Sequence, residues 1–599
     1  MKKYESLNLK EIIKDKKYFK SPEAWDEEIL YFLLVDRFNS HQENYPLYDP
    51  EKDYENAIQN ETDKKQWIEA GDKWIGGTLK GISEKLDYLK DLGISVIWIS
   101  PVLKQPIFSN NYHGYGIQNF LEVDPHFGSK KDLKDLVEKA HSMGIYIILD
   151  VIINHSGDVF AYKNDDPAYS GQEYEVEAFR DKDGMPTIEP QNPDYDKSWP
   201  EGGVWPQEIF NIDTFSRKGY ITDWDNDPEY REGDFYSLKN INTGNGDIKN
   251  YQSSQALKIL TECYKYWIAY ADLDGFRLDT VKHINPGAVR YFVQEIKEFA
   301  QTLGKKDFFI VGEITGGMEF AKTICEKTGL NAALGINKIP ENLENVAKGY
   351  YPPENYFSIF TNTEILSEGK HQWYHKKVIT MFDDHDMVYK QHHKERFCAD
   401  KKTAPLLINA EFINFFTAGI PCIYYGTEQG FDGSGDNDKY IRESMFGADF
   451  GAFRTKNRSF FNKNNPIYQE IKNFSDIRKE YIHLRIGRQY LRKISDSDNP
   501  ELHIPTADEN RSNEIVAWSR LFSQEEFLLA VNCDLKNEQS SRVIVDGTLH
   551  KPGDKFECIY SSDKEQIGKK AEVIKTDDWN QHLEIKLSAQ GRIIYKSIE

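Results

Sequence analysis

The chain has 599 residues, 97 acidic against 75 basic side chains and a net charge of −22, which argues against nucleic acid and anionic membranes as partners because both bind basic surfaces. Hydrophobic residues make up 39% of the sequence and aromatic residues 13%, so the chain can bury a large core and is not disordered. A chain of this length is expected to form about three or four domains.

After a charged segment over residues 1–28 that we predict to be helical, apolar runs of strand length alternate with helical segments. The apolar runs are continuous, as in parallel strands that are buried on both faces. Eight strands with intervening helices predict an α/β fold, a (β/α)8 TIM barrel. The strands are predicted over residues 29–35, 95–100, 145–150, 275–278, 308–313, 332–336, 377–382 and 421–425. The helices are predicted over residues 82–92, 133–143, 256–270, 286–300 and 404–416.

Two regions depart from this alternation. Residues 156–245 are rich in Asp, Asn, Gly, Pro and Tyr and lack the helical period, so we predict an irregular insertion after strand three. From residue 485 onward, short strands separated by turn residues predict a small antiparallel β-sandwich domain. The predicted domains are therefore a barrel formed by 1–155 and 246–484, the insertion 156–245, and a C-terminal domain 485–599.

The fourth predicted strand carries the first candidate site. Arg277 and Asp279 are two residues apart, so both side chains point to one face of the strand, while Phe276 points to the other. An adjacent arginine favours the ionised form of Asp279. A structural ion pair would also explain this arrangement. However, Lys282 and His283 follow where the strand ends, and such a polar cluster is more typical of a functional site.

Polar residues also follow other predicted strands. His155 comes after strand three, Glu313 ends strand five, and His385 and Asp386 come after strand seven. In a barrel these strand ends meet on one face, where the chemistry is carried out. Several carboxylates in one water-poor cleft push their pKa values apart, which suits glycoside hydrolysis with retention of configuration. Each acid alone could be a helix cap, but a complete set of caps is a weaker explanation.

The chain resembles the α-amylase family of retaining α-glucan enzymes. The resemblance lies in Asp150–His155, Gly275–His283, Gly312–Glu313 and His385–Asp386, and in Tyr112–Tyr115 after strand two, which matches the family's sugar-stacking segment. The order and spacing of these segments follow the family, and the resemblance covers essentially the whole chain.

The resemblance implies a role for each of these residues. Asp279 would be the nucleophile, Glu313 the general acid/base, and Asp386 the residue that binds sugar hydroxyls and favours the transition state. Contacts to the substrate are implied for His113, Tyr115, His155, Arg277, Lys282, His283 and His385.

The activity expected from this resemblance is cleavage of α-1,4-glucosidic bonds in starch-like glucans or maltooligosaccharides through a covalent glycosyl-enzyme. A transglycosylase on the same scaffold is the alternative, because the glycosyl-enzyme can be passed to a sugar instead of water. A non-catalytic glucan-binding protein is a minor alternative, against which the complete set of Asp279, Glu313 and Asp386 argues.

Two positions depart from the family pattern. Asp384 stands where the family usually has Asn before the histidine. Residues 238–242 replace a segment whose third residue, commonly a calcium-binding Asp, is here Asn240. We therefore predict Ca²⁺ bound by Asn154, Asn240 and the backbone carbonyl of His283, more weakly than with a carboxylate because an amide oxygen has no charge.

Residues 432–443 also resemble an EF-hand calcium loop, but Asn437 stands where that loop needs glycine, so we predict a mobile loop after strand eight.

The remaining expectations concern the location of the chain. No apolar run reaches membrane-spanning length, and the start of the chain lacks the pattern of a signal peptide. The six cysteines are scattered without metal-type spacing, which favours free thiols and a reducing compartment. We expect a cytoplasmic protein, or a secreted one whose signal has been removed.

Overall fold

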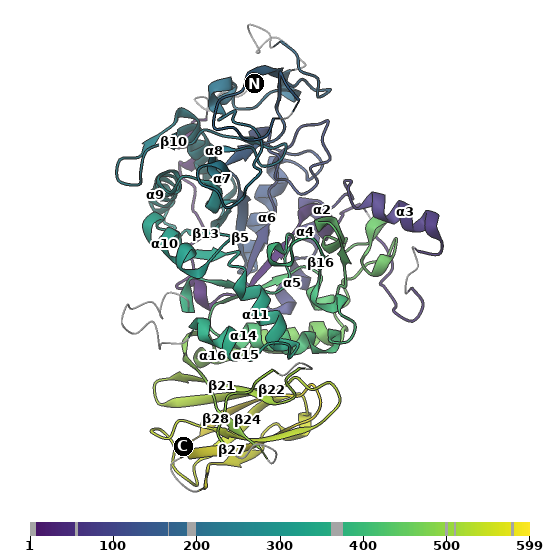
Figure 1. Cartoon of the computed structure of the whole chain (residues 1–599), viewed down its shortest axis with the longest axis vertical. Coiled ribbons are helices and arrows are strands. Elements are labelled where there is room, and N and C mark those ends of the chain that lie inside the picture. Colours follow the sequence, from purple (N-terminus) through teal and green to yellow (C-terminus); the bar gives the residue numbers. More distant parts are fainter. Residues whose placement is uncertain are drawn as a thin grey trace.

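The computed structural model describes residues 7–42, 44–53, 58–165, 167–188, 199–360, 375–496, 501–507, 511–576 and 580–598. Figure 1 shows three stacked regions: the insertion at the top, the barrel in the middle and the C-terminal β-strands at the bottom.

Eight parallel strands form the barrel, as predicted. They hydrogen-bond in the order β14-β13-β12-β5-β2-β1-β17-β15, and an isolated parallel bridge between Ala333 and Val378 closes the ring. The seventh strand, β15, is the shortest of the eight and has two residues. The strands are β1 (Leu30–Leu33), β2 (Val96–Ile99), β5 (Tyr146–Val151), β12 (Gly275–Leu278), β13 (Phe309–Glu313), β14 (Ala332–Leu334), β15 (Ile379–Thr380) and β17 (Ile420–Tyr424).

Helices follow the strands and surround them. Several begin at side-chain caps: Ser254 accepts from the amide of Leu257 at the start of α8, and Asn285 with Pro286 begins α9. The main helices around the barrel are α4 (Leu79–Glu84), α5 (Leu86–Leu92), α6 (Lys130–Ser142), α8 (Gln255–Ala271), α9 (Pro286–Thr302), α10 (Met318–Thr328), α11 (Lys338–Ala347), α14 (Leu407–Phe416) and α15 (Pro466–Glu480). The other helices of this region are α2 (Val35–Phe38), α3 (Glu61–Ala70), α12 (Glu354–Phe357) and α16 (Ile482–Ile486).

The prediction of a helical N-terminal segment was wrong for most of its length. Among the described residues before β1, only α1 (Leu9–Ile13) and a 3-10 turn (Trp25–Glu27) are helical. The segment between them forms hydrogen bonds with the end of α8 instead of the internal hydrogen bonds of a helix. Lys16 Nζ donates to the carbonyl of Ala269 at 2.7 Å, and the amide of Phe19 donates to Asp272 Oδ2 at 2.9 Å.

The insertion consists of short strands and turns. β6 (His155–Ser156) pairs antiparallel with β9 (Lys239–Asn240), which joins the end of the insertion to the end of barrel strand β5. The other elements are β7 (Phe160–Tyr162), β8 (Val176–Phe179), α7 (Glu229–Glu232), β10 (Gly244–Asn245) and β11 (Gln252–Ser253). This arrangement agrees with the irregular insertion expected after strand three.

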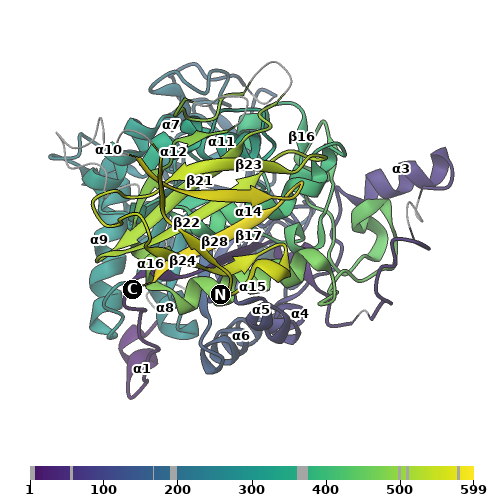
Figure 2. The same cartoon turned by 90° about the horizontal axis from the view of Figure 1, so that it is seen from below.

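The C-terminal strands form two antiparallel sheets, ordered β19-β21-β22-β28-β24-β25 and β20-β23-β27-β26. Apolar side chains from both sheets share one core, which includes Ile515, Val543 and Leu583. Trp518 Nε1 donates to the carbonyl of Phe416 at 3.1 Å and so joins this region to α14. Figure 2 shows the sheets covering one side of the barrel. The strands are β19 (Arg488–Leu491), β20 (Ile494–Ser495), β21 (Ile515–Phe522), β22 (Glu525–Asn532), β23 (Gln539–Ile544), β24 (Lys555–Ser561), β25 (Lys570–Glu572), β26 (Ile574–Thr576), β27 (Asn580–Leu587) and β28 (Arg592–Ile598).

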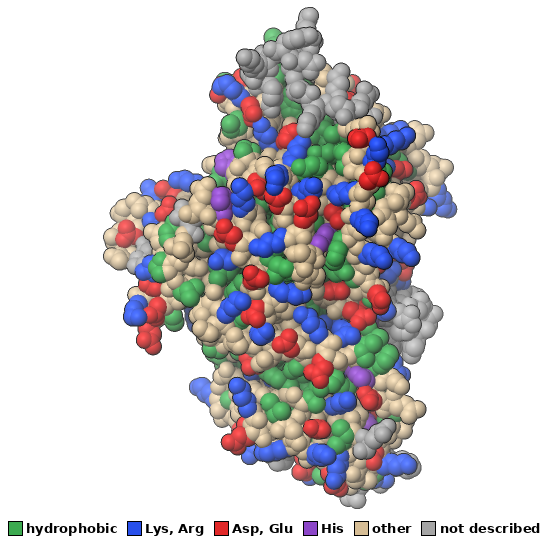
Figure 3. Space-filling model, turned by 180° about the vertical axis from the view of Figure 1, so that it is seen from behind, with side chains coloured by type: hydrophobic (Ala, Val, Ile, Leu, Met, Phe, Trp, Pro, Cys, Tyr) green, Lys and Arg blue, Asp and Glu red, His purple; other side chains and the backbone are tan. Residues whose placement is uncertain are grey.

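The surface carries charges of both signs. On the face drawn in Figure 3, acidic and basic side chains are interspersed and no continuous basic surface appears. Within the described ranges, no helix is long and apolar enough to cross a membrane. All six cysteines are buried and free, as expected for the thiols. The location of the protein in the cell stays a prediction, and so do the predicted domain limits.

Candidate active site

The guanidinium group of Arg277 contacts three carboxylates at the carboxyl ends of the strands. Its Nη1 lies 2.5 Å from Asp279 Oδ1 and 3.0 Å from Asp150 Oδ1, and its Nη2 lies 3.0 Å from Glu313 Oε2. The sheet register explains this arrangement, since Arg277 is directly opposite Asp150 on the neighbouring strand β5, and β12 also pairs with β13. Three acids from three strand ends therefore share one fixed positive charge.

The opposite face of β12 packs on the helices. The ring of Phe276 lies 5.8 Å from Tyr264 of α8 and 6.4 Å from Phe292 of α9, so its side chain points away from Arg277. The predicted alternation along this strand is therefore confirmed.

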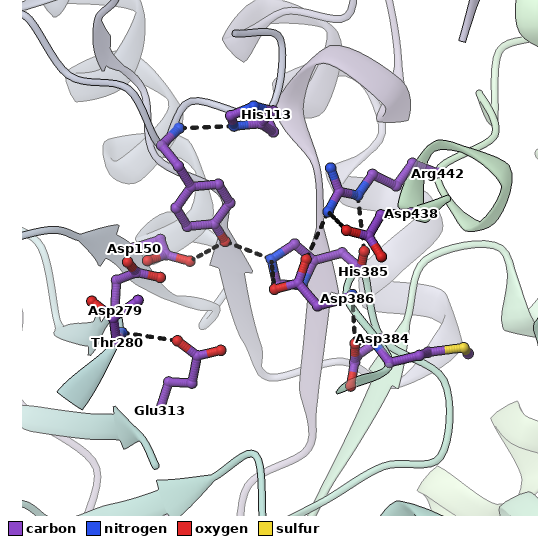
Figure 4. Close-up of polar contacts among 12 residues, drawn as sticks. His113, Asp150, Asp279, Thr280, Glu313, Asp384, His385, Asp386, Asp438 and Arg442 are labelled. Atoms are coloured by element: carbon purple, nitrogen blue, oxygen red, sulfur yellow. Dashed lines mark hydrogen bonds and ion pairs between the residues drawn. The ribbon is translucent and has the colours of Figure 1, made fainter. Parts of the chain in front are cut away.

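Glu313 is held by the turn that follows β12. The amide of Thr280 donates to Glu313 Oε2 at 2.8 Å, as Figure 4 shows. Thr280 has a left-handed φ of 47°, an uncommon conformation for a β-branched residue, and this conformation forms part of the turn from which its amide reaches Glu313. Local backbone strain therefore accompanies the contact between two strand ends.

Burial gives these acids higher pKa values than exposed carboxylates have. Burial raises the pKa of Glu313 to about 7, and the charges of Asp279 and Asp386 add to the rise while Arg277 opposes it. Burial also raises the pKa of Asp279, and Arg277 opposes this rise through its charge and its hydrogen bond. Arg277 thus favours ionised Asp279, as predicted from the sequence, and Glu313 can carry a proton near neutral pH.

Tyr115 joins two parts of the site. Its hydroxyl lies 2.9 Å from Asp150 Oδ2 and 2.7 Å from His385 Nε2, and its backbone amide donates to His113 Nδ1 at 3.1 Å. The rings of Tyr115 and His385 are nearly parallel, with centroids 5.5 Å apart. The structure therefore brings His113, Tyr115 and His385 together beside the acids, and their contact with a substrate stays a prediction.

The histidines of the site are uncharged near neutral pH. Burial lowers the pKa of His113 to about 3, of His155 to about 4 and of His385 to about 3. His155 Nε2 lies 3.9 Å from Asp279 Oδ2, so this ring also lies beside the acids of the site. Neutral imidazoles can both donate and accept hydrogen bonds, which suits the recognition of sugar hydroxyls.

Asp386 faces the same space from the loop after β15, and a buried arginine binds it. Arg442 Nη2 lies 2.6 Å from Asp386 Oδ1, and Arg442 Nε donates to the carbonyl of His385 at 2.8 Å. Burial opposes ionisation of Asp386, but His385, Arg442 and Arg277 lower its pKa to about 2. Because His385 is itself neutral at neutral pH, the two guanidinium groups and the ammonium of Lys394 hold Asp386 ionised there.

Asp384, the acid directly before His385, binds backbone amides rather than side chains. Its Oδ1 accepts from the amide of Asp386 at 2.7 Å and from the amide of Met387. Burial and repulsion from Asp386 raise the pKa of Asp384 to about 6. Asp384 therefore shapes the turn that carries Asp386.

Lys282 and His283 contact the insertion. Lys282 Nζ lies 2.7 Å from Asp225 Oδ1, and His283 Nδ1 lies 2.7 Å from the carbonyl of Tyr230. The ring of His283 also packs against Trp224, with centroids 5.7 Å apart. This pair therefore joins the end of β12 to the wall that the insertion forms beside the site.

Asn154 and Asn240 lie together under this wall. Asn240 Nδ2 lies 3.5 Å from Asn154 Oδ1 and 3.4 Å from the carbonyl of Arg231, and both asparagines are buried. Within the described part of the chain, no three His, Cys, Asp or Glu side chains are placed to hold a metal ion. Neutral oxygens at this position are Asn154 Oδ1 and the Arg231 carbonyl, and the carboxylate of Asp234 accepts from the backbone amide of Asn240 at 2.8 Å.

The segment that resembles an EF-hand is instead tied by basic side chains. Glu443 pairs with Arg396 at 3.0 Å, and Asp432 pairs with Arg454 at 3.2 Å and with Lys401. These cations neutralise its two end carboxylates, and the mobility of the loop stays a prediction.

Sequence reasoning missed two residues that hold the site together. Asp150, within the matched segment after strand three, contacts Arg277, and Trp98 Nε1 donates to it at 3.2 Å. Its position at the end of an apolar run was a usable signal, because an acid there must be paired when buried. Arg442 lies in an irregular loop after β17, and no periodic pattern pointed to it.

The fold and the site together define a class: a (β/α)8-barrel protein with a group of acids at the carboxyl ends of its strands. A family model described as "Alpha amylase, catalytic domain" matches residues 34–479. The chain therefore belongs to the α-amylase family.

Individual relatives agree with this assignment. The alpha-amylase of Streptomyces lividans is 30% identical over 458 residues, which cover 70% of this chain and 48% of that protein. The cyclomaltodextrin glucanotransferase of Klebsiella oxytoca is 25% identical over 498 residues, covering 76% of this chain and 65% of that protein. The solved alpha-amylase of Geobacillus thermoleovorans, complexed with acarbose, is 21% identical, covers 96% of this chain and 100% of that one, and superposes with a TM-score of 0.64.

The matched relatives are often longer than this chain. The match spans about half of the Streptomyces protein, 48%, and 32% of a beta/alpha-amylase of Paenibacillus polymyxa. Family membership and fold follow from these comparisons, and the activity of this chain is proposed below.

Proposed function

We propose that this protein is a retaining glycoside hydrolase that cleaves α-1,4-glucosidic bonds in starch-like glucans or maltooligosaccharides. The observation that carries the proposal is the contact of one guanidinium group with two acids in different environments, the buried Asp279 and the partly buried Glu313. Retaining glycosidases need one ionised carboxylate and one carboxylic acid of raised pKa. Relatives named as amylases and as a glucanotransferase support an α-glucan as substrate.

In the first step, Glu313 donates its proton to the glycosidic oxygen while Asp279 Oδ attacks the anomeric carbon. The bond to the leaving sugar breaks and a covalent glycosyl ester with Asp279 forms. In the second step, the Glu313 carboxylate takes a proton from water, and the resulting hydroxyl attacks the anomeric carbon. Asp279 is released as a carboxylate and Glu313 regains its proton.

The surrounding residues bind the sugar in this proposal. Asp386, held ionised by Arg442, accepts hydrogen bonds from ring hydroxyls and stabilises the positive charge that develops in the transition state. The neutral rings of His113, His155 and His385 bind further hydroxyls. Tyr115 offers its ring face for stacking, and Lys282 and His283 line the leaving-group side where the insertion meets the barrel.

Product analysis tests this function. We expect starch and maltooligosaccharides to be cleaved. Cleavage of pullulan would show the preference for one linkage over another, and cleavage of cyclodextrin would show whether cyclic glucans are accepted. NMR of the first-formed product should show the α anomer, since two displacements retain configuration. A first-formed β anomer would contradict the mechanism, and inactivity on every α-glucan would contradict the function.

Transglycosylation is the second candidate, and an aromatic surface favours it. The ring of Phe235 lies 5.8 Å from His155, and Tyr236, which is 70% exposed, lies 5.3 Å from Trp224. These rings lead from the carboxylates to solvent, and exposed aromatic faces suit the stacking of an acceptor sugar. Addition of maltose to the assay should then yield transfer products, and Tyr236→Ala should shift the product ratio towards hydrolysis.

We also propose a weak calcium site formed by Asn154, Asn240 and the backbone carbonyl of His283. The convergence of Asn154 Oδ1 and the Arg231 carbonyl on the Asn240 side chain supports it, because Ca²⁺ accepts neutral oxygen ligands. A bound ion would tie the insertion to the ends of β5 and β12. We expect chelation to lower the melting temperature, and an unchanged melting temperature without metal by elemental analysis would refute the site.

A further inference from the structure

The turn from His385 to Met387 carries Asp386 and is held on both edges of its backbone. On one edge, Asp384 Oδ1 accepts from the amides of Asp386 and Met387. On the other edge, Lys394 Nζ donates to the carbonyls of the same two residues, at 2.5 and 3.2 Å. Two side chains of opposite charge therefore bind the backbone of the same two residues, and the peptide between Asp386 and Met387 is bound at both its carbonyl and its amide.

The conformation of this turn needs such support. Met387 is fully buried and has a left-handed φ of 40°, which is disfavoured for a residue with a Cβ atom. Backbone conformations of this kind persist only where surrounding contacts determine them. The contacts of Lys394 and Asp384 fall on this residue and on its neighbour Asp386.

Lys394 is itself placed by contacts with the loop after β17. It lies in β16 (Lys394–Glu395), which pairs antiparallel with β18 (Ser434–Gly435). Its ammonium also lies 3.4 Å from Asp438 Oδ1, and its side chain is only 14% exposed. The other oxygen of Asp438 lies 3.4 Å from Arg442, the residue that binds the Asp386 carboxylate (Figure 4). Asp438 thus connects the two cations that hold this turn.

We propose that Lys394 is a positioning residue for Asp386, and that by binding the carbonyls of Asp386 and Met387 it directs the Asp386 carboxylate towards the substrate. This inference rests on the proposed function, in which Asp386 binds the sugar. Lys394 contacts backbone carbonyls and Asp438, so it acts through Asp386. Without its ammonium, the left-handed turn relaxes and the Asp386 carboxylate leaves the position that Arg442 defines.

The test is the variant Lys394→Met, which keeps the length and apolar stem of the side chain and removes the charge. We expect kcat/KM on maltooligosaccharides to fall about 100-fold, the scale of a displacement of about 1 Å in a catalytic group. Lys394→Arg should recover activity to within about tenfold of the wild type, because its guanidinium can also donate to two carbonyls.

The matched control is Lys439→Met. Lys439 lies next to Asp438, is also 14% exposed and pairs with an aspartate, Asp72, at 2.5 Å, but it does not reach the turn. We expect this variant to keep full activity. A loss equal to that of Lys394→Met would show a general effect of removing an ammonium from this region and would overturn the inference.

A double-mutant cycle separates positioning from a purely structural role. If Lys394 acts through Asp386, adding Lys394→Met to Asp386→Asn should lower the residual kcat/KM by less than about threefold, because residues that act as a unit are not additive. A further loss of about 100-fold in the double variant would overturn the proposal.

A crystal structure of Lys394→Met gives a readout that does not depend on activity. We expect Met387 to leave the left-handed region and Asp386 to lose its contact with Arg442. An unchanged turn would overturn the positioning role even if the wild-type enzyme were inactive on every α-glucan. Wild-type inactivity with a displaced turn would instead refute the proposed function alone.

Discussion

The acids of the site are held in two different ways. Asp279 and Glu313 lie at the ends of adjacent strands, and the arginine that binds them lies two residues before Asp279 on β12. Asp386 lies in a loop beyond the two-residue strand β15, and the arginine that binds it is 56 residues away in sequence. The first group is fixed by strand register, and the second by contacts between two loops.

This difference predicts different responses to mutation. In the strand-end group, the partners of an acid are set by backbone pairing, so removal of one side chain leaves the others in place. In the loop group, the backbone itself depends on side chains, because Asp384, Lys394 and Arg442 all bind the turn. We therefore expect changes at the strand ends to remove a reacting group without moving its neighbours. We expect changes in the loop to move the Asp386 carboxylate.

The largest effect is expected for Asp279→Asn. An amide cannot form the glycosyl ester, so kcat should fall by about 10⁴-fold or more, the scale seen when a nucleophile is removed. The fold should persist, because Asn keeps the size of the side chain. Stopped assays and circular dichroism measure the two quantities, and near-normal activity in a folded variant would rule out the assigned nucleophile.

A smaller effect is expected for Arg442→Met in the loop group. Loss of the guanidinium removes the contact with Asp386 and releases the carbonyl of His385, so kcat/KM should fall about 100-fold. The pKa of Asp386 should also rise, which would move the acid limb of the kcat/KM profile to higher pH. Arg442→Lys serves as the control that keeps the charge, and an unshifted limb in Arg442→Met would argue against this role.

The pH profile tests the strand-end group without mutation. Glu313 must be protonated to act as the acid, and its pKa of about 7 means that the active form is present below pH 7 and is lost as the pH rises through it. Above that value kcat/KM should fall about tenfold per pH unit, as for loss of one proton. Glu313→Gln should be slow at all pH values and lack this limb. The persistence of the limb in that variant would assign it to another group.

The same contrast explains what the sequence could predict. The barrel could be predicted because its strands are apolar runs. Arg277, Asp279 and Glu313 could be predicted because they lie on or directly after such runs, where the strand sets the direction of each side chain. Lys394 and Arg442 act across loops, and no local pattern relates a loop lysine to the carbonyls that it will bind. The prediction of a helical N-terminal segment was wrong for the same reason, since the hydrogen-bond partners of this segment lie at the end of α8, more than 250 residues away.

The smallest effect is expected for Asp384→Asn, which separates the hydrogen bonds of the loop from its charge. Asn keeps an oxygen that can accept from the amides of Asp386 and Met387, so the turn should persist and kcat/KM should change by less than about threefold. Burial and repulsion from Asp386 raise the pKa of Asp384 from 3.8 to about 6 in the folded protein. Below pH 3.8 the acid is protonated in both folded and unfolded states, so it has no pH-dependent effect there.

Between pH 3.8 and 6 the unfolded state loses its proton first, so this carboxyl lowers the free energy of unfolding as the pH rises, and its full cost is present above pH 6. Asp384→Asn removes that cost. The variant should therefore melt at a higher temperature than the wild type at pH 8 and at nearly the same temperature at pH 4, as measured by calorimetry. A variant that is less stable at pH 8 and much less active would show instead that the charge of Asp384, and not only its oxygen, holds the turn.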